Sequence, residues 1–134
     1  ECIAVRLRMV NRAVCGLYDE ALRPWGLKVS QLNLLVAAAK WGVARPADVC
    51  DQLHLDVSTL SRNVERMKAR GWLETVADPD RRAQPFRLTA AGETLLAEVA
   101  PAWEAAQRRA TELLGPQAVR QLDRAARRIR KSSS

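Results

Sequence analysis

The stretch Asp56-Val-Ser-Thr-Leu-Ser-Arg-Asn-Val-Glu-Arg-Met-Lys-Ala-Arg-Gly71 decides the fold of this chain. Four of its apolar residues recur at i, i+3, i+7 and i+10, which is one stripe of an α-helix: Val57, Leu60, Val64 and Met67. Polar and basic residues form the opposite stripe: Thr59, Arg62, Asn63, Arg66 and Arg70. Asp56 or Ser58 can cap the first turn, and Gly71 can end the helix in the left-handed conformation. The stretch predicts a helix with a buried apolar face and an outward face suited to nucleic acid.

The composition indicates one compact, basic domain. A length of 134 residues is enough for one hydrophobic core but not for two independent ones. The apolar fraction of 48% excludes a disordered chain. The formal net charge of +7 favours an anionic partner such as DNA, RNA or a membrane surface. No apolar run approaches the ~18 residues of a bilayer-spanning helix, so we expect no membrane insertion.

The cysteine and histidine pattern gives no sign of a bound metal or cofactor. The three cysteines, Cys2, Cys15 and Cys50, have neither C-x-x-C spacing nor the number that a disulfide framework needs. His54 is the sole histidine, which argues against a zinc-sensing site. The chain opens without a secretory signal, and a reducing cytoplasm is the expected compartment.

A helix-turn-helix is predicted around the opening stretch. Three helices are expected before it, over residues 1–23, 31–40 and 46–53. Ser30 is the expected N-cap of the second helix, and Pro46 suits the first position of the third. His54-Leu55-Asp56 then leads directly into the opening stretch. A short helix, a three-residue turn and a second helix with a basic outward face form the helix-turn-helix pattern.

A β-hairpin is predicted directly after this motif. Residues 72–77 alternate in polarity, and Phe86-Arg-Leu-Thr89 offers a return strand. Between them lies Asp78-Pro-Asp-Arg-Arg-Ala-Gln-Pro85, a turn-rich loop with two adjacent arginines. A hairpin that follows a recognition helix is a wing.

Both ends of the chain are predicted to be helices with more apolar surface than one winged lobe can cover. Apolar residues step by four and three over residues 1–23, 90–114 and 116–131, with Thr89 as a cap and Pro101 as a kink. The simplest partner for these seams is a second copy of the chain. A twofold dimer would present two recognition helices roughly 34 Å apart, one turn of B-DNA.

The predicted fold is mainly α, a winged helix-turn-helix with terminal dimerisation helices. Residues 28–89 form the DNA-binding lobe, and residues 1–24 and 90–131 form a helical dimerisation lobe. Together they make a single domain of residues 1–134.

Four short motifs resemble the MarR family of bacterial transcription regulators: Leu55-Asp-Val-Ser-Thr-Leu-Ser-Arg62, Arg70-Gly-Trp-Leu-Glu74, Asp78-Pro-Asp-Arg-Arg82 and Leu88-Thr-Ala-Ala-Gly92. The order of elements also agrees from about residue 5 to residue 130. The resemblance implies a homodimeric repressor that binds double-stranded DNA at a near-palindromic operator. It also implies release by a small aromatic or phenolic effector, a metal or an oxidant.

The resemblance implies DNA contacts by position. Five residues would meet the major groove: Ser58, Thr59, Ser61, Arg62 and Asn63. Arg66 would hold a phosphate, and Arg81 or Arg82 would reach the minor groove. Physical chemistry agrees, since an arginine can donate a bidentate pair to guanine and is attracted by the potential of a narrow minor groove. The wing is about one residue shorter than the commonest family pattern, which leaves open which arginine leads.

Three aromatic residues near the second helix are candidates for lining an effector pocket: Tyr18, Trp25 and Trp41. A redox or soft-metal response through Cys2 and Cys15 is an alternative, because both lie on the first helix. A winged helix that binds protein is a further alternative, although it would not need the serine and arginine face. No G-x-x-x-x-G-K, G-x-S-x-G or H-E-x-x-H motif occurs, so we expect no enzymatic activity.

Overall fold

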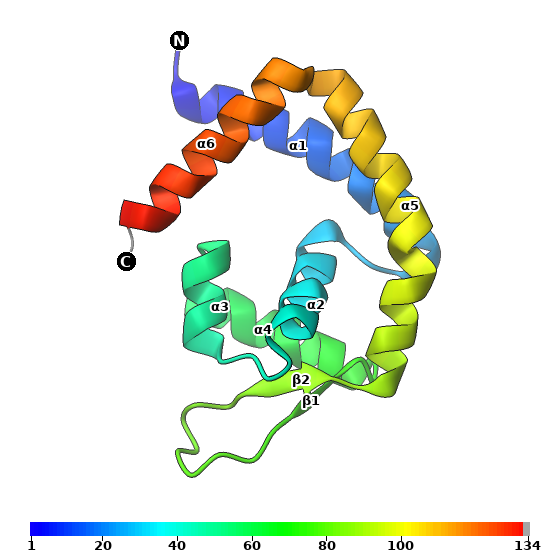
Figure 1. Ribbon diagram of the computed structural model, residues 1–134, viewed down its shortest axis with the longest axis vertical. Helices are drawn as coiled ribbons and strands as arrows, with labels where there is room; N and C mark the ends of the chain where they lie inside the picture. The colour runs from blue at the N-terminus through cyan, green and yellow to red at the C-terminus, as the bar shows by residue number, and fades with distance from the viewer. Residues whose placement is uncertain (133–134) are drawn as a thin grey trace.

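The computed structural model describes residues 1–132, so residues 133–134 of the predicted domain lie outside the described part. The elements follow in the order α1 (Ile3–Leu22), η1 (Arg23–Trp25), α2 (Val29–Trp41), α3 (Pro46–Leu53), α4 (Val57–Ala69), β1 (Leu73–Thr75), β2 (Phe86–Leu88), α5 (Ala90–Leu114) and α6 (Pro116–Ser132). Figure 1 shows α1, α5 and α6 arching over a lobe made of α2, α3, α4 and the hairpin. The predicted mainly α, winged helix-turn-helix fold is confirmed.

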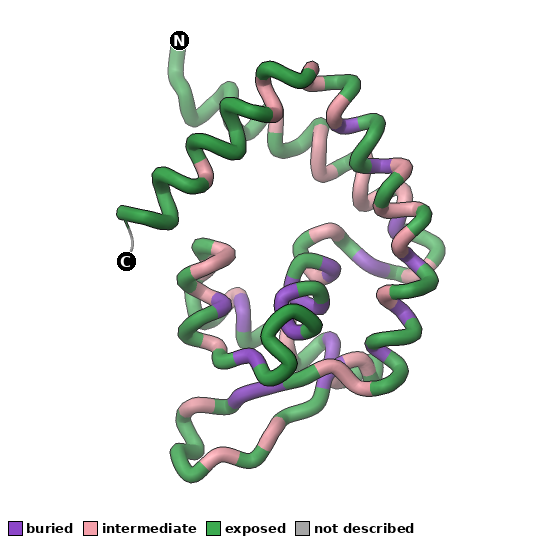
Figure 2. The backbone as a smooth tube through the Cα atoms, in the orientation of Figure 1, coloured by how far each residue is buried: buried purple, intermediate pink, exposed green. Residues whose placement is uncertain are grey.

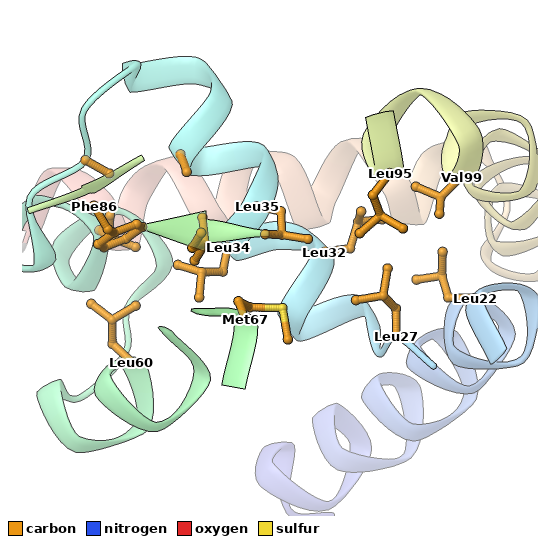
Figure 3. Packing of buried hydrophobic residues seen from close by; sticks show 14 residues of the cluster. Leu22, Leu27, Leu32, Leu34, Leu35, Leu60, Met67, Phe86, Leu95 and Val99 are labelled. Carbon is orange, nitrogen blue, oxygen red and sulfur yellow. The ribbon is translucent and has the colours of Figure 1, made fainter. Parts of the chain in front are cut away.

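One hydrophobic cluster holds the lobe and the arch together. Leu34, Leu60, Met67 and Phe86 gather where α2, α4 and the hairpin meet (Figure 3). The same cluster continues to residues of the arch and of the α1–α2 connection: Leu22, Leu27, Leu95 and Val99. The core is therefore continuous from α1 and α5 to α4, and a close-packed core of this kind transmits strain between the elements that share it.

The hairpin is short and is joined by a third segment. β1 and β2 pair antiparallel, with Leu73 opposite Leu88 and Thr75 opposite Phe86. Ala44 adds a bridge on the other side of Phe86, with N–O distances of 2.8 and 2.9 Å. The connection between α2 and α3 therefore supports the base of the wing.

The start of α2 differs from the sequence prediction. The predicted N-cap Ser30 lies inside the helix, which begins at Val29 with Lys28 as its N-cap. The amide of Val29 donates to Asp19 Oδ1 at 2.8 Å, so a side chain of α1 satisfies the first turn of α2. The prediction was wrong because this acceptor lies on another helix, ten residues earlier in the chain.

The position of Val57 also differs from the prediction. Val57 was expected in the buried stripe of α4, but its side chain is 69% exposed. Leu60 and Met67 of the same stripe are buried, and Val64 is half-buried. Val57 therefore lies at the edge of the core, although Leu60, three residues further along α4, is buried.

Most residues along α1 and α6 are exposed, as Figure 2 shows, and several of them are apolar. The helix α6 has no buried residue, and Ile3 of α1 is 73% exposed. α5 continues through Pro101 as one curved helix (Figure 1). None of the helices within residues 1–132 is both long and apolar enough to cross a membrane.

Candidate nucleic-acid interface

The first turns of α4 present a connected exposed surface. Val57, Ser58, Ser61 and Arg62 are all exposed, and their spacing of one, four and five residues places them side by side. Thr59 and Asn63 are half-buried. Of the five residues predicted for the major groove, three are therefore fully presented to a partner and two are presented in part. We call the exposed set Val57, Ser58, Ser61 and Arg62 the α4 front.

Asp56 holds the α4 front in place. Its Oδ1 accepts hydrogen bonds from the amide of Thr59 at 2.6 Å and from Ser58 Oγ at 3.1 Å. The hydrogen bonds from Thr59, then that from Ser58, and the nearby charge of Arg62 hold the pKa of Asp56 below its ordinary value. Because Ser58 donates its proton to Asp56, its hydroxyl oxygen offers a base edge a hydrogen-bond acceptor.

Arg62 is only weakly held within the chain. Its Nη2 lies 3.5 Å from Thr59 Oγ1, at the outer limit of a hydrogen bond. The planar guanidinium can therefore turn to donate a bidentate pair to a partner such as guanine. Arg66 is exposed one turn further along α4.

The wing is ordered by its own acidic residues. Asp78 Oδ1 accepts from the amide of Asp80 at 2.9 Å, and Asp80 Oδ1 accepts from the amide of Arg82 at 2.9 Å. Arg45 pairs with Asp78 Oδ2 at 3.0 Å, and the Asp78 side chain is only 16% exposed. These contacts leave the side chains of Arg81 and Arg82 exposed near the tip.

The two wing arginines line two different hollows. A hollow of about 100 Å³ lies between α4 and the wing, with Val57 and Ser61 on the helix side and Arg82 on the wing side. A second hollow, of about 370 Å³, brings Arg81 beside Lys68 at the rear of α4. Arg82 thus lies next to the α4 front, and Arg81 extends the basic surface behind it.

Arg70 does not serve the role that the sequence suggested. It belongs to the polar and basic stripe that is predicted to face nucleic acid. Instead, its guanidinium donates to the carbonyl oxygens of Trp25 at 2.9 Å and Gly26 at 3.1 Å. It also lies over the ring of Trp72. The Arg70 guanidinium therefore joins the end of α4 to the α1–α2 connection, where Gly26 lies within hydrogen-bonding distance.

The aromatic residues predicted for an effector pocket are not brought together. Trp25 and Trp41 lie at opposite ends of α2, which is about 20 Å long at 1.5 Å per residue. Tyr18 donates to Gln107 Oε1 and lies near Trp103, with ring centroids 6.4 Å apart. The pKa of Tyr18 is raised by burial and by the neighbouring Cys15.

An apolar hollow does open between α2 and α5, a short distance from Tyr18. Its volume is about 230 Å³. Six residues line it: Leu32, Val36, Leu96, Val99, Ala100 and Trp103. The sequence did not indicate Trp103 as a pocket residue, because it fits the apolar period of α5 and was assigned to helix packing.

The two cysteines of α1 are far apart. Cys2 and Cys15 are separated by about 20 Å along the helix at 1.5 Å per residue, so they cannot pair within one chain. Cys2 is exposed, whereas burial and then Asp19 raise the pKa of the Cys15 thiol. A raised pKa lowers the thiolate fraction that reacts with oxidants. Within residues 1–132, no group of three or more His, Cys, Asp or Glu residues could hold a metal ion.

Comparison with known proteins agrees with this geometry. A family model described as a winged helix DNA-binding domain matches residues 42–92, which run from the end of α2 to the first turn of α5. The Multiple antibiotic resistance protein MarR of Escherichia coli is 27% identical over 90 residues. That match covers 66% of this chain and 62% of the length of MarR.

Solved structures share the whole arrangement of helices. BpsR of Bordetella bronchiseptica is 25% identical, with a TM-score of 0.83 and coverage of 96% of this chain and 93% of that one. Its DNA binding is regulated by 6-hydroxynicotinic acid. E. coli MarR in complex with operator DNA has a TM-score of 0.82 at 22% identity, and the match covers 95% of this chain and 92% of that one.

The fold, the α4 front and the wing define a protein with a winged-helix DNA-binding domain. Further similar proteins are described as transcriptional regulators, among them YwoH of Bacillus subtilis, 25% identical over 66% of this chain, and a MarR-family protein of Rhodococcus, 26% identical with a TM-score of 0.81. In sequence and in fold, the chain is similar to proteins of the MarR family.

Proposed function

We propose that this protein is a homodimeric transcription repressor that binds a near-palindromic DNA operator. The observation that carries the proposal is a hollow between α4 and the wing with Ser61 on one side and Arg82 on the other, while Arg62, next to Ser61 on α4, is exposed. One arginine can read a base in the major groove while the other enters the neighbouring minor groove. The proposed contact residues are Ser58, Thr59, Ser61, Arg62, Asn63, Arg66, Arg81 and Arg82.

The uncovered arch supports the dimer. Leu7, Val10 and Val14 of α1 face Leu114 and Leu122 across a hollow of about 480 Å³. A second copy would bury this surface and hold two recognition helices at a set spacing. A protein-binding winged helix is the weaker candidate, because nothing in such a role calls for the exposed arginines of α4 and the wing.

A small aromatic effector is proposed to act at the hollow between α2 and α5. An apolar cavity of about 150 Å³ can hold a benzene ring, and this hollow is larger. It lies between the arch and the lobe, so a ligand there would change how the two pack. BpsR, whose DNA binding responds to 6-hydroxynicotinic acid, shares this fold.

Mobility-shift titration against genomic fragments tests the DNA-binding function. We expect a preferred fragment, a footprint with two similar half-sites and a steep loss of affinity as salt rises. Light scattering should give the mass of a dimer. Binding without sequence preference, or a monomer at the concentrations that bind DNA, would contradict the proposal.

Release from the preferred fragment tests the effector. Titrations with 6-hydroxynicotinic acid, phenolic acids, peroxide and copper or mercury salts would run in parallel. Val36→Trp should fill the hollow and abolish release by aromatic acids while DNA binding remains. Val43→Trp, at an exposed valine that does not line the hollow, is the matched control. The redox or soft-metal alternative would be favoured if only peroxide or a metal salt released the protein from DNA, and if the Cys2→Ser, Cys15→Ser double variant no longer responded.

A further inference from the structure

Val57 is an exposed apolar residue on a surface that is otherwise polar. Within residues 28–89, all of which the structure describes, four large apolar side chains are exposed: Val36, Trp41, Val43 and Val57. Val36 lines the hollow between α2 and α5, and Trp41 and Val43 lie at the end of α2. Val57, at 69%, is the most exposed of the four and the only one on α4.

The backbone holds Val57 in a defined place. It is the first residue of α4, directly after Asp56, whose carboxylate fixes the first turn through Thr59. A valine in a helix has one strongly preferred side-chain rotamer, so its two methyl groups point in one direction. Their contact with a partner would therefore cost little conformational entropy.

The neighbours of Val57 identify the kind of partner. Ser61 lies one turn along the same face, and the two line one side of the hollow opposite Arg82. Serine and arginine can hydrogen-bond base edges, but neither recognises a methyl group. In the major groove, thymine is distinguished by its 5-methyl group, which is read by apolar contact.

We propose that Val57 reads a thymine, through contact of its methyl groups with the 5-methyl group of that base in each half-site. The inference rests on the proposed function, because it requires α4 to lie in the major groove. The proposal makes Val57 a residue that determines DNA specificity, whereas the apolar period of α4 predicts it to be buried. Arg62 and the serines then read hydrogen-bonding groups, and Val57 reads the one apolar group in the groove.

Replacing thymine by deoxyuridine tests the inference, because this change removes only the methyl group. Each thymine of the footprinted half-sites would be replaced in turn, and binding measured by fluorescence anisotropy. At one thymine per half-site we expect wild-type affinity to fall by about fourfold, the worth of one buried methyl group. Val57→Ala should bind the thymine and uracil forms equally at this position, and Val57→Ile should retain the preference.

Val43→Ala is the matched control and should keep the wild-type response to uracil, because this exposed valine lies in the connection between α2 and α3 and not on α4. Circular dichroism melting would show that Val57→Ala folds. Binding to the preferred operator with no uracil effect at any thymine would overturn the inference. So would a uracil effect of the same size in Val57→Ala. Both outcomes leave the proposed DNA-binding function standing, whereas failure to bind any preferred fragment would overturn both.

Discussion

The guanidinium of Arg70 lies 4.0 Å from the centre of the Trp72 ring, and so connects the end of α4 to the strand that follows it. The same group donates to two carbonyl oxygens in the connection between α1 and α2. Trp72 in turn accepts a hydrogen bond from the amide of Thr89, the N-cap of α5, at 3.0 Å. The end of α4 is thus linked at one junction to the α1–α2 connection and to the N-cap of α5.

Arg70→Ala should weaken DNA binding without removing a DNA contact. Loss of the junction lets α4 change its angle to the arch, so affinity falls while the number of phosphate contacts stays the same. The slope of log affinity against log salt should therefore be unchanged. Arg66→Ala, the matched variant, should lower that slope by about one per half-site, or about two for the dimer, because it removes a phosphate contact from each chain. A reduced slope in Arg70→Ala would show that Arg70 binds phosphate after all.

Arg62→Ala should relax base preference. Loss of a bidentate pair to a base costs about 1–3 kcal/mol, or about 5- to 150-fold in affinity at one position per half-site. Binding to a panel of operators with single-base changes would measure this. Arg120→Ala, an exposed arginine of α6, should leave the preference intact. An unchanged preference in Arg62→Ala would mean that α4 is not placed in the groove as proposed.

The Arg45–Asp78 ion pair should limit the mobility of the wing loop more than it raises the free energy of unfolding of the whole protein. Arg45 is more than half exposed, so the pair should contribute at most about 1 kcal/mol to folding. Loss of Arg45 releases the base of the loop that carries Arg81 and Arg82. Trypsin should then cut after these arginines faster in Arg45→Ala than in the wild type. Arg87→Ala, which breaks the pair with Glu74 on the strands, should show a smaller increase.

Gly92 should tolerate no side chain. A Cβ built on it would lie 2.3 Å from the carbonyl oxygen of Trp72, which is backbone and cannot move aside. Gly92→Ala should therefore destabilise the fold by about 1–3 kcal/mol in urea unfolding. Gly16→Ala is the matched control, since no neighbouring atom lies within 4 Å of that position in α1. It should stabilise the helix by about 0.5–1 kcal/mol. Equal effects at the two glycines would contradict the close contact of α5 with Trp72.

The Asp56 cap should make stability depend on pH in the acid range. Hydrogen bonds from Thr59 and Ser58 lower the pKa of Asp56 from its ordinary 3.8, so its ionised form stabilises the folded state. This contribution is complete above about pH 5 and is lost as pH falls below 3.8 and through the lowered pKa. Asp56→Asn keeps a capping oxygen but has no charge to titrate. The difference in melting temperature between wild type and Asp56→Asn should shrink between pH 5 and pH 3; a constant difference would contradict the assignment.

Local patterns were sufficient to predict the order of elements and most of their ends. The caps Asp56 and Thr89 and the terminators Gly42 and Gly71 act within a few residues of the bonds they satisfy. The apolar period in each segment likewise reports the local backbone. Such features depend on near neighbours in the chain, so the winged helix-turn-helix could be recognised before any contact was known.

Contacts between distant segments could not be predicted in this way. Asp19 caps another helix, Arg45 pairs with a residue 33 positions away, and Arg70 reaches Trp25 across 45 positions. Val57 follows the apolar period of α4, yet it is exposed, because the extent of its burial depends on where α3 and the wing dock. Sequence periodicity reports which side of a helix is apolar. How far along that side the core extends is set by the packing of elements that are remote in the chain, and this packing places the residues proposed to meet DNA.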